Sequence, residues 1–273
     1  MFEDVVVIRG GGDIATGICH KLHRSGFKVL ILEIEKPTMV RRTVSFASAV
    51  YDCETVVEKV KSVKAYNTKD IYKIWNDDQI PVIVDPECKI IDEMKVDILV
   101  DATLAKRNLG MNRTMAPITI GVGPGFDAGE DVDVVIETNR GHDLGKLIFK
   151  GYAKVDTGIP GKILGYGKER VLRAPCHGII NNLSDIGDII KKDQIIAYVD
   201  NEPVKASLDG ILRGMIMHNS KVKKGLKIAD IDPRGIKEYC FTISDKARSV
   251  AGGVLEAILY TKGSSKKIKT ECE

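Results

Sequence analysis

A run of β-branched residues that ends in three glycines constrains the fold of this chain more than any other stretch. Val5 to Ile8 form the apolar run, and Gly10, Gly12 and Ala15 follow it at the spacing G-x-G-x-x-A. In dinucleotide-binding proteins this spacing joins a buried strand to a helix through a tight turn. The stretch therefore predicts a strand, a glycine turn and a helix. A tight turn with nothing bound is the alternative.

The start of the predicted helix is a candidate anion site. The first N–H groups of a helix have no acceptor within it and present a partial positive charge. A phosphate or a dinucleotide held in this way would lie against the backbone of the glycine turn. The candidate contacts are Gly10, Gly11, Gly12, Asp13 and Ile14.

A second predicted strand, residues 28–32, ends at Glu33. Dinucleotide-binding folds place an acidic residue about 20 positions after the glycine turn, where it contacts the ribose hydroxyls. Glu33 has that position, and Glu35 is the next candidate. An acid disfavours a 2′-phosphate, so we expect NAD rather than NADP if a dinucleotide binds.

Two further apolar runs, residues 81–85 and 96–101, alternate with helical segments. Continuous apolar strands separated by helices are typical of a parallel sheet that is covered on both faces. The first half therefore predicts the fold class α/β, with a Rossmann-like parallel-sheet domain over residues 1–165 that binds a nucleotide or cofactor.

Charged residues and glycines follow several predicted strands, at the edge where open α/β sheets bind ligands. Paired N–H groups of arginine suit a phosphate or a carboxylate. Solvated surface charge is the alternative for the basic residues, and a contorted connection is the alternative for the glycines. The candidate cofactor contacts in this group are Arg41, Arg42, Lys106, Arg107, Gly123, Gly125 and Arg140.

Arg140 and His142 stand in a polar loop that follows a predicted strand over residues 132–137. An imidazole beside a guanidinium could transfer protons or contact an oxyanion. A structural role in the loop is the alternative for His142. These two residues are the weak catalytic candidates, and no other catalytic residue is assigned.

The second half contains an internal repeat. Residues 174–179 align with residues 206–211 at an offset of 32, and the same offset aligns further apolar positions without a gap. A constant offset predicts two similar units of short strands. The spacing resembles the biotinyl/lipoyl, or barrel-sandwich, fold over residues 166–235. Because the tip between the halves is Asp200 to Pro203 and Lys205 falls in the next strand, we expect neither biotin nor lipoate. A C-terminal helix and tail complete the predicted organisation, over residues 236–273.

Composition narrows the class of protein. The net charge is only +3, which gives no argument for nucleic-acid binding. No apolar run approaches the ~20 residues that a membrane span needs. Six cysteines occur singly, without a C-x-x-C pair. We therefore expect reduced thiols, no metal site, no membrane partner and a cytoplasmic location.

Five loops together form a distinctive set: residues 9–17, 41–46, 101–108, 123–126 and 136–142. With the lipoyl-like segment, they resemble the YqeB-type family of selenium-dependent molybdenum hydroxylase system proteins. The N-terminal half is also distantly similar to the Rossmann part of XdhC-type chaperones. The resemblance implies an accessory factor that helps to mature a molybdenum hydroxylase, and it covers nearly the whole chain.

The function expected from this resemblance is maturation of the hydroxylase, with a phosphate-bearing cofactor or nucleotide bound at the glycine-rich edge of the sheet. NAD and a molybdopterin-type cofactor are the ligand candidates. The expected partners are the hydroxylase or proteins of its cofactor pathway, and a second copy of the chain is kept open. One alternative is an NAD-dependent oxidoreductase that uses Glu33 and His142. Another is a non-catalytic scaffold that docks the hydroxylase. Whether a reaction is catalysed is left open.

Overall fold

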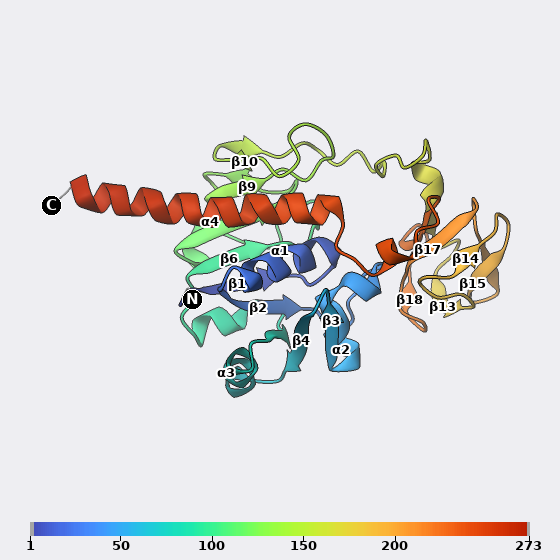
Figure 1. The fold of residues 1–273 in the computed structure, drawn as a ribbon, viewed down its shortest axis with the longest axis horizontal. Helices are drawn as coiled ribbons and strands as arrows, with labels where there is room; N and C mark the ends of the chain where they lie inside the picture. The colour runs from blue at the N-terminus through green and yellow to red at the C-terminus, as the bar shows by residue number, and fades with distance from the viewer. Residues whose placement is uncertain (1–2, 272–273) are drawn as a thin grey trace. The chain divides into compact units, whose positions relative to one another are not determined.

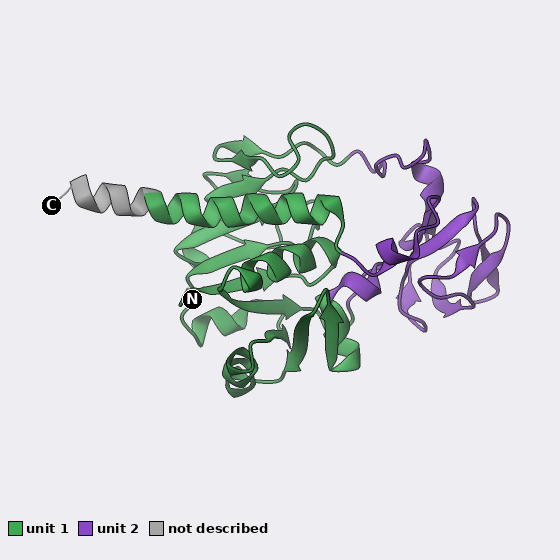
Figure 2. Ribbon diagram, viewed as in Figure 1, with its two compact units in different colours: residues 1–36, 46–156, 243–273 green, residues 37–45, 157–242 purple. Residues whose placement is uncertain are grey.

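A computed structural model describes residues 3–271, with side chains as far as residue 263. It divides into two compact units (Figure 2). Unit 1 contains the described residues of 1–36, 46–156 and 243–273, and unit 2 contains residues 37–45 and 157–242. The chain thus passes between the units after residues 36, 45, 156 and 242, whereas the three domains predicted from the sequence follow one another. Cys272 lies outside the described residues.

Unit 1 is built on a nine-stranded sheet with the order β10-β9-β7-β6-β1-β2-β5-β4-β3 (Figure 1). The strands from β9 to β4 run parallel to their neighbours, and the two outermost strands are antiparallel to theirs. The bounds are β1 Val5–Arg9, β2 Lys28–Glu33, β3 Glu54–Val57, β4 Val60–Ala65, β5 Ile80–Val84, β6 Ile98–Asp101, β7 Ile118–Val122, β9 Val134–Ile136 and β10 Leu147–Ile148. A small antiparallel pair joins β8 Asp127–Ala128 to β11 Gly151–Tyr152.

The α-helices within residues 3–271 all belong to unit 1: α1 Asp13–Arg24, α2 Ala49–Asp52, α3 Thr68–Asn76 and α4 Asp245–Glu271. The apolar side chains of α1 recur at helical spacing and are buried, as the sequence pattern requires. α4 packs along α1 in the centre of the unit (Figure 1). Gly17 makes this approach close, because a Cβ there would lie 2.8 Å from Cβ of Ala247. The remaining helical turns of the unit are 3₁₀: η2 Phe46–Ser48, η3 Lys89–Asp92 and η4 Arg113–Met115.

Unit 2 consists of two four-stranded antiparallel sheets, with the orders β12-β19-β17-β14 and β16-β15-β13-β18. Its elements are η1 Arg42–Val44, η5 Lys168–Arg170, β12 Val171–Arg173, β13 Gly178–Asn182, β14 Ile189–Ile190, β15 Ile195–Val199, β16 Glu202–Lys205, β17 Gly210–Met215, β18 Lys221–Val222, β19 Lys227–Asp232 and η6 Lys237–Cys240. Apolar side chains from both sheets form one core. Segment 37–45 joins the unit at β17, where the N–H of Met215 donates to the carbonyl of Val40 at 2.8 Å.

The protein is α/β, but the predicted architecture, a Rossmann-like parallel sheet followed by a biotinyl/lipoyl-like domain, is wrong. The sheet is not the parallel sheet of a Rossmann-like domain, because antiparallel strands extend it at both edges and no α-helix connects β6 to β7 or β7 to β9. Unit 2 is not a self-contained biotinyl/lipoyl-like domain of residues 166–235, because residues 37–45 and 157–165 also belong to it. The C-terminal helix packs into unit 1. Buried apolar runs predict strands, but they do not give the direction or the partner of each strand.

Candidate functional site

The glycine turn between β1 and α1 is shaped by close packing. Gly10 has φ +89°, and a Cβ there would lie 3.1 Å from Cα of Thr103, in the loop after β6. A Cβ on Gly11 would lie 2.9 Å from the backbone nitrogen of Ala47, whose N–H donates to the carbonyl of Gly11. Both positions therefore require glycine for steric reasons, whether or not a ligand binds.

Gly12 is different, because it is open. It has φ −65°, which any residue can adopt, and nothing lies within 4 Å of the position of its Cβ. Gly12 is the N-cap of α1, and its carbonyl accepts the first helical hydrogen bond from Thr16. Among the described residues, no acceptor bonds to the N–H groups of Ile14 and Ala15. This helix start has the open backbone that an anion needs.

Glu33, the residue predicted to contact a ribose, holds the glycine turn. Its Oε1 accepts the N–H of Gly11 at 2.7 Å, and its Oε2 accepts the N–H of Ile34 at 2.9 Å. Burial raises the pKa of Glu33, and these two backbone donors oppose that rise. The carboxylate ties the end of β2 to the turn after β1, so its position at the sheet edge has a structural cause independent of any dinucleotide.

A buried ion pair anchors the neighbouring loop. Nη1 of Arg9 donates to Oδ2 of Asp101 at 2.9 Å, and both side chains are buried. The other oxygen of Asp101 accepts the backbone N–H and the hydroxyl of Thr103, at 3.1 and 2.7 Å. These bonds fix the chain as it leaves β6 beside the glycine turn. The sequence shows only a charged residue at the end of each of two apolar runs, which does not reveal that the two are paired.

The second glycine-rich loop packs against two others. Gly125 has φ +115°, and a Cβ there would lie 2.5 Å from the backbone nitrogen of Arg107. A Cβ on Gly123 would lie 2.8 Å from Oγ1 of Thr138, in the loop after β9. The loops that follow β1, β6, β7 and β9 therefore meet at one edge of the sheet, as expected for neighbouring parallel strands. We call these four loops the carboxyl-edge loops (residues 10–12, 102–108, 123–126 and 137–145).

Two of the basic residues of these loops, Lys106 and Arg140, are held in ion pairs. Arg140 donates from Nη1 and Nη2 to the two carboxylate oxygens of Asp245, at 2.7 and 2.9 Å. Nζ of Lys106 lies 2.5 Å from Oδ2 of Asp156. Arg107 is exposed. His142 is also exposed, and none of the described residues forms a hydrogen bond to its ring. The structure thus brings Lys106, Arg107 and Arg140 to this edge, with two of the three in pairs.

Arg41 and Arg42 belong to unit 2, and both side chains donate hydrogen bonds to oxygen atoms of that unit. Arg41 is buried, and its Nη2 donates to the carbonyls of Tyr239 and Thr242 at 2.9 and 3.1 Å. Nε of Arg42 donates to the carbonyl of Met215, and its Nη2 pairs with Asp185, each at 2.7 Å. These contacts hold segment 37–45 within unit 2. Chain order alone predicts this pair at the edge of the sheet, whereas the chain enters unit 2 at residue 37.

Lys246, on the first turn of α4, is a residue of this region that the sequence analysis did not identify. Its side chain is half-buried. Burial lowers its pKa, and Arg140 lowers it further, whereas the carboxylates of Asp13, Asp156 and Glu137 oppose the shift. A lysine near the start of a helix gives no sequence signal, since more than a hundred positions separate it from the loops.

The five described cysteines are free thiols, and Cys19, Cys88 and Cys240 are buried. Burial raises the pKa of Cys88 to about 11. No group of three or more His, Cys, Asp or Glu side chains suited to a metal ion occurs between residues 3 and 271. Within the same residues, no helix is both long enough and apolar enough to cross a bilayer.

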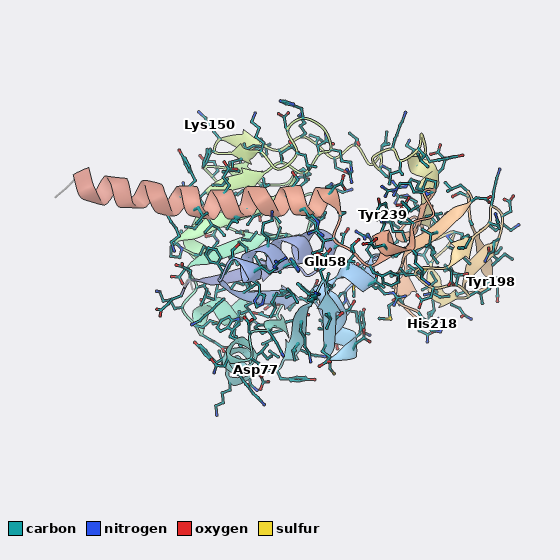
Figure 3. All side chains as sticks on the ribbon, viewed as in Figure 1. Glu58, Asp77, Lys150, Tyr198, His218 and Tyr239 are labelled. Atoms are coloured by element: carbon teal, nitrogen blue, oxygen red, sulfur yellow. The ribbon has the colours of Figure 1, made fainter. Side chains whose placement is uncertain are left out.

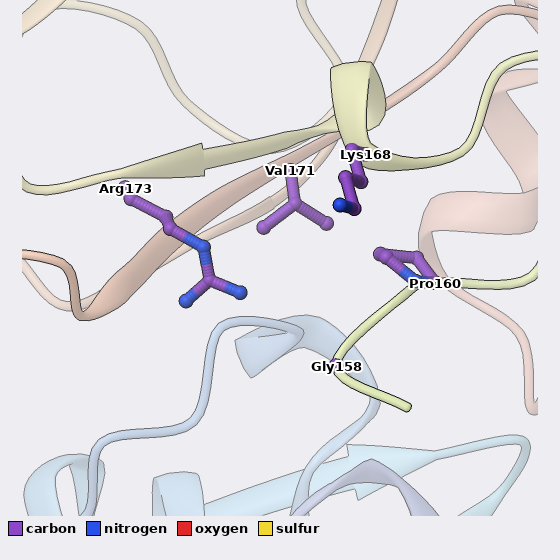
Figure 4. Close-up of a pocket in the computed structure, with 5 residues that line it drawn as sticks. All are labelled: Gly158, Pro160, Lys168, Val171 and Arg173. Atoms are coloured by element: carbon purple, nitrogen blue, oxygen red, sulfur yellow. The ribbon is translucent and has the colours of Figure 1, made fainter. Parts of the chain in front are cut away.

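A hollow of about 280 Å³ lies in unit 2 and is lined by Gly158, Pro160, Lys168, Val171 and Arg173 (Figure 4). Its two basic side chains would suit an anion. However, Nη1 of Arg173 already donates to the carbonyl of Gly225 at 2.9 Å. The hollow contains none of the residues predicted from the sequence.

Comparison with known proteins gives one substantial sequence match. An Escherichia coli K12 protein described as "Uncharacterized protein YqeB" is 49% identical over 257 residues, which are 94% of this chain and 48% of that protein. The match supports the YqeB-type resemblance. The chain spans about half the length of this curated relative. No family model matches the chain.

Two solved structures show a remote likeness. The ectoine utilization protein EutE (DoeB) of Ruegeria pomeroyi, in a product-bound form, is 12% identical, with 84% of this chain and 85% of that chain covered and a TM-score of 0.26. An aspartoacylase family protein of Mesorhizobium loti is 10% identical, with the same coverage and the same TM-score. At such scores neither likeness carries an argument about this chain.

Proposed function

We propose that the protein is an accessory factor for the maturation of a selenium-dependent molybdenum hydroxylase, and that it binds a phosphate-bearing cofactor or nucleotide at the carboxyl-edge loops. The observation that carries the proposal is the open start of α1 at Gly12, beside three further loops of the same edge. The sequence match to YqeB also supports the proposal. Because the chain spans about half of that relative, the activity and partners of the whole protein are part of the proposal.

The ligand contact that we propose is between phosphate oxygens and the backbone N–H groups at the start of α1. The aligned peptide dipoles of α1 favour an anion there, typically by ~0.3–1 kcal/mol for each charge near an exposed helix end. Lys106, Arg107 and Arg140 lie on the same edge and would add positive charge. NAD and a molybdopterin-type cofactor both carry phosphate, so the same contact would serve either.

The structure gives less support to an NAD-dependent oxidoreductase than the sequence alone does. Both carboxylate oxygens of Glu33 accept backbone N–H groups of the chain itself. His142, the acid–base candidate, is exposed rather than enclosed beside a reacting group. We therefore retain the accessory role as the proposed function.

Gly12 offers a direct test, because a side chain can be added there without strain. Gly12→Leu would place a bulky group over the start of α1, where nothing lies within 4 Å of a Cβ. We expect binding of pyrophosphate, measured by calorimetry, to weaken at least about tenfold. Gly263→Leu is the matched control, since Gly263 is another open glycine in unit 1. Unchanged pyrophosphate binding by Gly12→Leu would show that the glycine turn is only a turn.

The accessory role needs a separate test in cells that produce a selenium-dependent molybdenum hydroxylase. Deletion of the gene for this protein should abolish hydroxylase activity, and the Gly263→Leu protein should restore it. The Gly12→Leu protein should not restore it. Mass spectrometry of small molecules retained by the gently purified protein would identify the ligand. Full hydroxylase activity after the deletion would contradict the proposed function.

A further inference from the structure

The hollow of about 280 Å³ in unit 2 has positive charge in its lining (Figure 4). Lys168 and Arg173 carry that charge, and none of the described residues that line the hollow is acidic. Figure 4 shows Val171 between the two basic side chains. Every lining residue belongs to unit 2, so the hollow shares no residue with the carboxyl-edge loops of unit 1.

Neither basic side chain is neutralised by a carboxylate. Across the described side chains, no hydrogen bond or ion pair involves Nζ of Lys168, and no ion pair involves Arg173. Nη1 of Arg173 donates to the carbonyl of Gly225 at 2.9 Å, which orients the guanidinium and uses one of its five N–H groups. Glu169 is adjacent to Lys168 in the sequence, but its Oε2 accepts the N–H of Gly167 at 2.8 Å. Two positive charges therefore border one hollow.

The alternation of side chains along β12 places Val171 and Arg173 together. Residues two positions apart on a strand point to the same face of the sheet. Leu172, which stands between them, is buried in the apolar core of unit 2. Val171 and Arg173 therefore point away from that core. β12 is the outermost strand of its sheet, next to β19, so this outer face is at a sheet edge.

A buried ion pair holds two walls of the hollow in place. Nη2 of Arg170 donates to Oδ1 of Asp230 at 2.9 Å, and both side chains are buried. Nη1 of Arg170 donates to the carbonyl of Gly161, also at 2.9 Å. Since Arg170 precedes Val171 and Gly161 follows Pro160, one guanidinium ties both lining segments together. It also pairs with Asp230, the residue opposite Val171 on β19, so this carboxylate already has a cation.

We propose that this hollow binds the phosphate group of a small phosphate monoester, as an anion site additional to that of the proposed function. The paired N–H groups of Arg173 suit phosphate oxygens, and the amine of Lys168 supplies a second positive charge. A phosphate monoester carries about two negative charges near neutral pH, which two cations match. The volume of about 280 Å³ lies just below the ~300–1,000 Å³ of pockets for drug-sized ligands, so the ligand is small. Carbon atoms of Val171 and Pro160 would contact its body.

Calorimetric titration with phenyl phosphate at pH 7.5 tests the proposal. The full-length Gly12→Leu protein is the background, so that the start of α1 is blocked. We expect Lys168→Gln together with Arg173→Gln to weaken binding at least about tenfold, because two charge-assisted contacts are lost. Lys205→Gln together with Lys221→Gln is the matched control, since it removes two exposed positive charges from the other sheet of unit 2. It should change binding less than about twofold, because distant surface charges are screened.

Lys168→Gln alone guards against a loss of structure. Because no hydrogen bond or ion pair among the described side chains depends on Lys168, this variant should fold like the parent protein. It should nevertheless weaken phenyl phosphate binding at least about threefold. Circular dichroism of each variant checks the fold. No measurable binding in the Gly12→Leu background, or equal weakening in the two double variants, would overturn the proposal.

Two further ligands test the chemical class. Benzoate has the same ring but a single negative charge, and it should bind at least about tenfold more weakly than phenyl phosphate. Inorganic phosphate lacks the apolar body and should also bind more weakly. Equal affinity for benzoate would overturn the phosphate group as the ligand, and equal affinity for inorganic phosphate would overturn the monoester. Pyrophosphate binding that is lost in Gly12→Leu reports on the proposed function, so the two proposals can fail separately.

Discussion

Glu58, which is labelled in Figure 3, lies in the turn that joins β3 to β4 and forms an ion pair of 2.5 Å with Arg248, in the first turns of α4. The same carboxylate oxygen of Glu58 accepts the N–H of Ile243 at 2.8 Å, just before α4 begins. One side chain thus holds both the start of the long helix and the chain that enters it. Since α4 also carries Asp245 and Lys246, the pair helps to set the position of the candidate site.

Removal of this carboxylate should destabilise unit 1. We expect Glu58→Ala to lower the free energy of unfolding by about 1–2 kcal/mol, because a charged acceptor of two donors is lost and the N–H of Ile243 is left without it. Glu54→Ala is the matched control on the same hairpin, since Glu54 forms a more exposed pair with Lys61. It should cost less than about 0.5 kcal/mol. Urea denaturation of both variants measures the difference, and equal losses would contradict a special role for Glu58.

The hairpin that carries Glu58 could not be predicted from the sequence. Its two turn residues, Glu58 and Lys59, have φ values of +45° and +70°. Tight hairpin turns of this kind usually contain Asn or Gly, which tolerate positive φ, and neither occurs here. Without that signal, the sequence of residues 55–63 predicts only an extended or mixed segment. Contacts made across the unit, not local preference, hold this turn in place.

The local part of the site was easier to predict than its distant part. The strand, the glycine turn and the helix over residues 5–24 were predicted because steric requirements act between neighbours in the sequence. Lys246 was missed, and Arg41 and Arg42 were assigned to a sheet edge while the chain carries them into unit 2. These outcomes depend on which segments pack together, and no periodicity or spacing within one segment encodes that.

Acidification should destabilise the protein through His20. This histidine is buried on α1, and burial lowers its pKa from the ordinary value of 6.5, opposed by the carbonyl and carboxylate of Glu58 and assisted by Arg24 and Arg248. Below pH 6.5 the unfolded chain therefore binds more protons at this residue than the folded chain does. Stability should fall as the pH drops from 6.5 towards the folded pKa, by at most about 1.4 kcal/mol per pH unit for one group.

Urea denaturation between pH 5 and pH 7.5 tests this prediction. His20→Gln should reduce the pH dependence of the free energy of unfolding without removing it, because burial also lowers the pKa of His23 on the same helix. A slope that is the same in the parent and in His20→Gln would show that His20 does not sense pH.

Two alanine substitutions in the glycine turn should destabilise the protein to different extents. Gly10→Ala forces φ +89° on a residue with a Cβ and crowds Cα of Thr103, so it should cost about 1–3 kcal/mol. Gly12→Ala should cost less than about 1 kcal/mol, since only the mild preference for glycine over alanine at an N-cap is lost. Thermal and urea denaturation compare the two variants. Equal destabilisation would mean that Gly12 is as constrained by packing as Gly10.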